Sequence, residues 1–230
     1  MKRTKLRDRV LPDYTKGEEI FNSVSHGVGF AFAIAALVLC VVMAALRGNA
    51  RAVVSASIYG STMILLYAAS TLYHGITHTF TKKVLQVVDH CTIFFLIAGS
   101  YTPMTLVTLH DVKPAYGWSL FGVVWGITII GCVFTAIDWK KYNVLSMICY
   151  LGMGWCVIFF IDDVARSLGL GGTIFLASGG VLYTIGAVLY MLGHKHRYFH
   201  SIFHLFVLGG SICHFFTILF YILPCERPLW

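Results

Sequence analysis

The sequence predicts an all-α integral membrane protein, a bundle of seven transmembrane helices with a cytoplasmic N-terminus and an outside C-terminus. Hydrophobic residues make up 58% of its 230 residues and charged residues only 12%. In soluble domains about 45–50% of the residues are apolar and about 25% are charged. The mean hydropathy is +0.78. The apolar residues also form blocks of about 20, the length that crosses about 30 Å of hydrocarbon as a helix. This composition excludes an ordinary soluble enzyme, a disordered chain and a secreted disulfide scaffold.

Seven such blocks follow one another, separated by short polar gaps. They cover residues 27–46, 52–73, 84–109, 117–137, 144–161, 173–192 and 199–223. Pro103 lies late in the third block and is expected to kink its helix, which a membrane bundle tolerates. The expected organisation is a short basic cytoplasmic segment at residues 1–17, a transmembrane domain at 18–223 and a short outer tail at 224–230.

The Lys and Arg residues predict the orientation. With the blocks taken as alternating spans, twelve of the 17 bases lie on the side of the N-terminus: Lys2, Arg3, Lys5, Arg7, Arg9, Lys16, Lys82, Lys83, Lys140, Lys141, Lys195 and Arg197. The other five are Arg47, Arg51, Lys113, Arg166 and Arg227. Because cytoplasmic loops are enriched in Lys and Arg, the N-terminus is expected inside. Since these bases stand in short runs between apolar blocks, we expect no nucleic-acid partner despite the charge of +7.

Histidine is common for so apolar a chain, with ten copies against ten acidic residues. Ser70 and His74 are four residues apart, as are His200 and His204, so each pair shares one face of its helix. In the predicted orientation the second helix ends near His74, and the third and seventh helices begin near Asp89 and His200. These polar groups from three helices therefore fall at a similar depth, near the cytoplasmic boundary.

Ionisable groups at membrane depth are costly and often mark functional sites. Three neutral histidines plus water form an established catalytic zinc site, which makes His74, His200 and His204 candidate ligands of Zn2+. Zinc lowers the pKa of its bound water toward about 7, and Asp89 is the candidate to accept a proton from that water or to orient it. Ser70 could hydrogen-bond the same water or a polarised carbonyl. The alternative is that the histidines sit at the headgroup level and that Asp89 is a structural hydrogen-bond partner.

A second polar stripe consists of Glu19, Asn22 and His26, at offsets of three and seven residues. If this segment is helical, the three side chains share a face and enter the bundle from the cytoplasmic side. The alternative is an interfacial helix in which Glu18 and Glu19 occupy the first turn, where the helix dipole favours acidic groups.

The remaining histidines are not candidate metal ligands. His214 lies deeper and is expected to form a hydrogen bond within the bundle. The histidines at 78, 110, 194 and 196 fall in predicted loops and are expected to face water or lipid. His90, next to Asp89, has no assigned role.

The motifs Glu19-x-x-Asn22-x-x-x-His26, Ser70-x-x-x-His74, Asp89 and His200-x-x-x-His204 together resemble those of the hemolysin III family. That family belongs with the progestin and adipoQ receptors (PAQR) and more remotely with alkaline ceramidases. The resemblance runs from about residue 18 to residue 222. It implies a seven-helix bundle in which His74, His200 and His204 hold zinc near the cytoplasmic side, Asp89 holds or activates the zinc-bound water, and Ser70 lies beside them.

The resemblance also implies a function and a location. We expect a multi-pass protein of a bacterial plasma membrane, possessing zinc-dependent hydrolase chemistry on a lipid amide or ester bond, as in ceramide cleavage. Membrane lipid would be both environment and substrate; no oligomeric state is predicted. One alternative is a haemolytic pore-former or membrane-stress regulator with a structural zinc. A third reading, a ligand receptor, is disfavoured because only about 18 residues precede the first motif, without a cytoplasmic domain.

Overall fold

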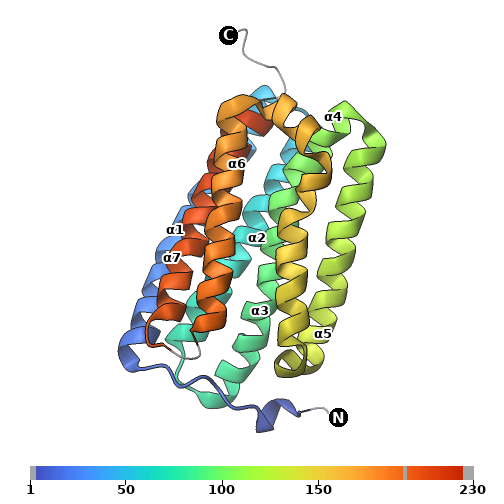
Figure 1. Ribbon diagram of the computed structural model, residues 1–230. Coiled ribbons are helices and arrows are strands. Elements are labelled where there is room, and N and C mark those ends of the chain that lie inside the picture. Colours follow the sequence, from blue (N-terminus) through green and yellow to red (C-terminus); the bar gives the residue numbers. More distant parts are fainter. Residues whose placement is uncertain (1–3, 194–195, 225–230) are drawn as a thin grey trace.

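Long helices lie side by side in the computed structural model, which describes residues 4–193 and 196–224 (Figure 1). Within these ranges the structure has no strand. The long helices are α1 (Lys16–Arg47), α2 (Ala50–Gly75), α3 (Thr79–Pro103), α5 (Pro114–Trp155), α6 (Ile161–Leu192) and α7 (Phe199–Thr217). Shorter helical elements are η1 (Leu6–Asp8), η2 (Met104–Leu109), α4 (His110–Val112), η3 (Cys156–Phe160) and η4 (Ile218–Ile222).

The helices place large apolar side chains outside and small ones inside. Along α1, the buried positions include Gly29, Ala33, Ala36, Cys40 and Ala44, spaced by three or four residues. The same helix exposes large apolar side chains, including Val24, Val28, Val38, Leu39 and Val42. Small residues let membrane helices approach closely, while lipid solvates the outer face. This distribution is that of an integral membrane protein.

Five helical stretches in the described ranges are long and apolar enough to cross a membrane: Lys16–Arg47, Ala50–Gly75, Thr79–Val112, Pro114–Leu192 and Phe199–Ile222. The fourth has 79 residues and would extend roughly 120 Å as one straight helix, about four times the hydrocarbon thickness. It therefore has to change direction within a bilayer.

The chain reverses direction twice in that stretch, once at each end of the bundle (Figure 1). Asp138 has non-helical backbone angles, and beyond it the chain returns so that Thr135 and Ser146 lie within hydrogen-bond distance, 3.3 Å. Gly169 has a φ of +66°, a conformation open to glycine. The indole of Trp155 donates to the hydroxyl of Thr184, 3.0 Å away, across this second reversal.

Most predicted blocks coincide with helices, and several boundaries differ. The helix expected from residue 27 begins at Lys16, because Thr15 and Glu18 form a capping box at its start. The gap expected at 162–172 is helical, with its break confined to Gly169. Pro103 is the last residue of α3, and the chain continues as the π-helix η2. Residues 1–3, 194–195 and 225–230, including Lys2, Arg3, Lys195 and Arg227, lie outside the described residues.

Candidate metal centre

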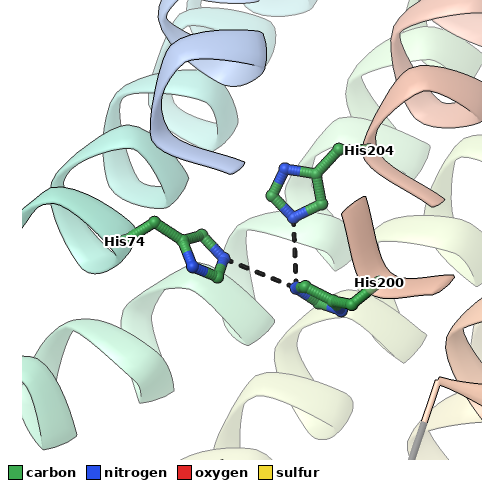
Figure 2. A group of neighbouring side chains, drawn as sticks. All are labelled: His74, His200 and His204. Carbon is green, nitrogen blue, oxygen red and sulfur yellow. Dashed lines mark hydrogen bonds between the residues drawn. The ribbon is translucent and has the colours of Figure 1, made fainter. Parts of the chain in front are cut away.

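Three buried histidines converge at the end of the bundle where α1 begins. His74 stands in the last turn of α2, and His200 and His204 stand on one face of α7. The Nε2 atom of His200 lies 3.4 Å from Nε2 of His74 and 3.1 Å from Nε2 of His204. Figure 2 shows the three rings turned toward one another from two helices. The structure thus brings together the three histidines that the spacing singled out.

These separations match the donor set of a zinc ion. Zinc binds histidine nitrogens at about 2.0–2.1 Å in tetrahedral geometry, so two bound nitrogens lie about 3.3–3.4 Å apart. The ligand nitrogens of the three histidines all lie within 4.8 Å of one another. All three histidines are buried. In the part of the chain that the structure describes, this is the only such group of three or more His, Cys, Asp or Glu side chains.

Side chains of α1 hold His74 from behind. Its Nδ1 lies 2.7 Å from Oε2 of Glu19, and the other oxygen of Glu19 lies 2.8 Å from Nζ of Lys82. The side-chain nitrogen of Asn22 lies 3.4 Å from the same Nδ1. A carboxylate that accepts from Nδ1 leaves Nε2 free to bind a metal, the arrangement seen around many metal-bound histidines. The polar stripe of Glu19, Asn22 and His26 at the start of α1 therefore faces the interior of the bundle. This is the first of the two alternatives that the sequence left open, and the other was an interfacial helix.

His26, the last residue of that stripe, stacks on His204. The two ring centroids are 3.7 Å apart and the planes are inclined by 22°. His26 also meets the ring of Tyr67 edge-on at 5.0 Å. His26 thus packs against a candidate ligand and limits how its ring can turn.

Ser70 and Asp89 line a cavity of about 130 Å³, which His26 and His204 also line. The Ser70 hydroxyl lies beside the Asp89 carboxyl group, which is 14% exposed. The structure therefore places Asp89 next to the histidine cluster and outside it, because the three-membered group does not include this carboxylate.

The other side chains that line this cavity are mostly apolar. Ile93, Leu96, Ile97, Met147, Leu151 and Val207 are among the lining residues. A second cavity of about 80 Å³ shares Tyr101, Trp155 and His214 with the first, and continues toward the opposite end. A polar end joined to a long apolar cavity suits an amphipathic ligand with a hydrocarbon chain.

The cavity also contains a contact between His90 and Tyr190 that the sequence did not predict. His90 donates from Nδ1 to the carbonyl oxygen of Gln86 at 2.7 Å, so its Nε2 can accept from the Tyr190 hydroxyl at 3.1 Å. His90 and Tyr190 are 100 residues apart, on α3 and α6. In the sequence, the position of His90 next to Asp89 indicates that His90 lies near the site. No spacing rule connects Tyr190 with His90.

Tyr14 is a further residue that sequence reasoning missed. Its ring stacks on His200 with centroids 4.9 Å apart and planes inclined by 21°, and its centroid lies 5.7 Å from that of His74. Burial raises the pKa of its phenol above the ordinary value, so the ring is neutral at physiological pH. The pattern Thr15-x-x-Glu18 was the available signal, since a capping box locates the helix start immediately after Tyr14.

The other histidines lie apart from the centre. His214 lines the apolar cavities and meets Tyr183 edge-on at 5.2 Å. His78 is exposed and its side chain accepts from the backbone of Thr81 at the start of α3. His110 is partly buried and pairs with Arg51, at 2.8 Å from Nε2, so the expectation of a solvated loop histidine is wrong for this residue. His194 lies outside the described residues.

The chain is similar to known proteins over most of its length. The family model described as "Haemolysin-III related" matches residues 14–215. Hemolysin-3 from Bacillus cereus is 41% identical over 207 residues, which cover 90% of this chain and 93% of that protein. The Hemolysin-3 homolog of Bacillus subtilis is 42% identical over 208 residues, covering 90% and 96%. The human monocyte to macrophage differentiation factor is 28% identical over 173 residues, covering 72% and 69%.

Proposed function

Because this chain belongs to the haemolysin-III-related family, we propose that it is a zinc-binding multi-pass membrane protein that hydrolyses an amide or ester bond of a lipid. The observation that carries this proposal is the convergence of His74, His200 and His204, of which His204 lines a largely apolar cavity together with Ser70 and Asp89. The Bacillus relatives support a bacterial plasma membrane as its location.

The proposal includes seven spans with the histidines near the cytoplasm. The reversals at Asp138 and Gly169 divide residues 114–192 into three passes, and α1, α2, α3 and α7 supply the others. Lys82 and Arg197, two of the bases that predict the inner side, lie at the end of the bundle that holds the histidines. The excess of Lys and Arg on that side supports a cytoplasmic N-terminus and an outside C-terminus.

His74, His200 and His204 would hold the metal through Nε2, with Glu19 fixing the ring of His74. When bound, zinc supplies a Lewis acid that polarises a carbonyl group and lowers the pKa of water. Asp89 takes the proton of a water molecule whose oxygen adds to the acyl carbon, and it returns this proton to the leaving nitrogen or oxygen as the bond to the acyl carbon breaks. Ser70 orients the carboxyl group of Asp89, and the products are a fatty acid and an amine or alcohol.

The apolar cavity would bind the hydrocarbon chain and bring the acyl carbonyl to its polar end. Its lining of aliphatic and aromatic side chains excludes water from the chain. Ceramide-like amides are the substrate class of this proposal, because an apolar cavity lined at one point by Ser70 and Asp89 suits an amphipathic lipid with a hydrocarbon chain.

Metal analysis of the full chain purified in detergent tests the centre. We expect about one zinc per chain in the wild type, and almost none in a His74→Ala/His204→Ala variant. His110→Ala is the matched control, because it removes a histidine at the opposite end of the bundle and should keep its zinc. Equal zinc in the double variant and the wild type would contradict the proposed ligands.

Lipid mass analysis tests the reaction. Membranes containing ceramide and phospholipid are incubated with the wild type and with Asp89→Asn, which keeps the size of the side chain and removes its basicity. We expect a free fatty acid to appear with the wild type, and its rate of formation to fall at least about 100-fold in the variant. A wild type that holds zinc and releases no fatty acid from any lipid would leave the metal site standing and overturn the hydrolase.

The name of the Bacillus cereus relative, Hemolysin-3, favours a second candidate, membrane lysis with a structural zinc. Lysis through a pore of defined size is blocked by large osmotic protectants, whereas lysis that follows lipid cleavage is not. If large polymers protect erythrocytes from the wild type and Asp89→Asn lyses them equally well, the pore is the better description.

A further inference from the structure

The segment that precedes α1, residues 4–15, crosses the end of the bundle that holds the histidines (Figure 1). We call it the strap. The backbone nitrogen of Thr4 donates to Oδ2 of Asp138 at 2.9 Å, at the reversal of α5. The Arg9 guanidinium donates to the carbonyl oxygen of Ile137 at 3.0 Å, and Nζ of Lys83 donates to the carbonyl oxygen of Arg7 at 2.6 Å. The strap is thus tied to α3 and α5.

The residues on both sides of Tyr14 are also held. The Arg197 guanidinium donates to the carbonyl oxygen of Asp13 at 2.7 Å and to Oε2 of Glu18 at 3.3 Å. The backbone nitrogen of Thr15 donates to the same oxygen of Glu18 at 2.8 Å. Because its two neighbours are anchored, the strap can hold the Tyr14 ring in one place against His200.

A polar pocket of about 340 Å³ lies beside the ring of Tyr14. Asp13, Glu18, Tyr190, His196, Arg197 and His200 are among its lining residues. Tyr190 lines both the polar pocket and the apolar cavity, whereas His200 lines the polar pocket. His200 is therefore approached by a polar space on the aqueous side, and Tyr14 covers one face of its ring.

We propose that Tyr14 is a positioning residue of the metal centre, which fixes the ring of His200 and covers it on the aqueous side, and that the polar pocket is the route by which metal and water exchange. The inference rests on the proposed metal site. A ring stacked on a ligand restricts its rotation, and removal of such an outer partner weakens metal binding by about 10- to 100-fold. The phenol hydroxyl is not needed for this role, so phenylalanine should replace Tyr14.

Metal release from the full chain in detergent is the test. Wild type, Tyr14→Ala, Tyr14→Leu and Tyr14→Phe are loaded with zinc, and its transfer to an excess of chelator is followed in time. We expect about 10- to 100-fold faster release from Tyr14→Ala and Tyr14→Leu, and a rate near that of the wild type from Tyr14→Phe. Tyr142→Ala is the matched control, because it removes a partly buried tyrosine that packs on Phe134 and does not contact the histidines.

Cobalt substitution gives a second readout. The visible absorption of bound Co2+ reports the geometry of its ligands, and we expect it to change in Tyr14→Ala and Tyr14→Leu but not in Tyr14→Phe. Unchanged release and an unchanged spectrum in folded Tyr14→Leu would overturn the role of Tyr14 while leaving the metal centre intact. A wild type that binds neither zinc nor cobalt would contradict the metal centre itself, and the two failures are thereby distinguished.

Discussion

Nδ1 of His74 lies 2.7 Å from Oε2 of Glu19, 55 residues earlier in the chain. The contact joins the start of α1 to the end of α2, and Lys82 at the start of α3 neutralises the same carboxylate at 2.8 Å. One side chain of α1 thus sets the direction in which His74 presents Nε2 to the other histidines.

Loss of this carboxylate should weaken zinc binding without removing a ligand. For Glu19→Gln we expect an affinity about 10- to 100-fold lower than that of the wild type, since the amide no longer carries the charge that polarises His74. Competition with a chelator of known affinity measures this change. Asp162→Asn, which alters an exposed carboxylate elsewhere in the bundle, is the control and should match the wild type. An unchanged affinity in Glu19→Gln would show that the contact does not tune the metal.

Stacking of His26 on His204 should stabilise the folded protein. Aromatic pairs contribute about 0.5–1.5 kcal/mol beyond the area that they bury. We expect His26→Ala to lower the thermal unfolding temperature in detergent, and His26→Phe, which keeps a ring against His204, to recover most of the loss. If His26→Phe is as unstable as His26→Ala, the polar atoms of His26 rather than its ring are what matters.

Zinc should stabilise the protein, because the three ligands come together only in the folded bundle. At a free zinc concentration 100 times Kd, the free energy of unfolding rises by about 2.7 kcal/mol, which corresponds to an increase of about 5–10 °C in Tm. Differential scanning fluorimetry with zinc and with chelator measures the shift. It should persist in His110→Ala and disappear in His74→Ala/His204→Ala; a shift of the same size in the double variant would locate the zinc elsewhere.

Two glycines should respond differently to the same substitution. A β-carbon at Gly99 would collide with the Thr62 hydroxyl on α2, whereas one at Gly122 has no atom within 4 Å. We expect Gly99→Ala to lower the free energy of unfolding by about 1–3 kcal/mol through overpacking. Gly122→Ala should be neutral or stabilising, because alanine favours a helix by about 1 kcal/mol. Chemical unfolding in mixed micelles measures the free energy of unfolding of both variants. Equal changes in Gly99→Ala and Gly122→Ala would argue against close packing of α2 and α3.

The helical spans and the face that each residue occupies could be predicted from the sequence. The apolar blocks identified where helices run, since in a bilayer each span must satisfy its own backbone hydrogen bonds. Spacing of four residues placed His200 and His204 on one face of α7, and the structure has them there. The loop expected at 162–172 was wrong because polar residues near the membrane surface can remain helical, and only Gly169 has the conformation that breaks the helix.

What the sequence determined by itself is therefore a helical membrane protein in which His74, Asp89 and His200 fall near the same end of their helices. Only the tertiary structure decided which nitrogen faces which, as in the 3.4 Å between His74 and His200, 126 residues apart. Helical periodicity sets the face of a side chain, but the neighbour that this face meets depends on how the helices pack. Only the tertiary structure places the strap and Tyr14, because an irregular segment has no periodicity and its place follows from hydrogen bonds with residues far away in the sequence.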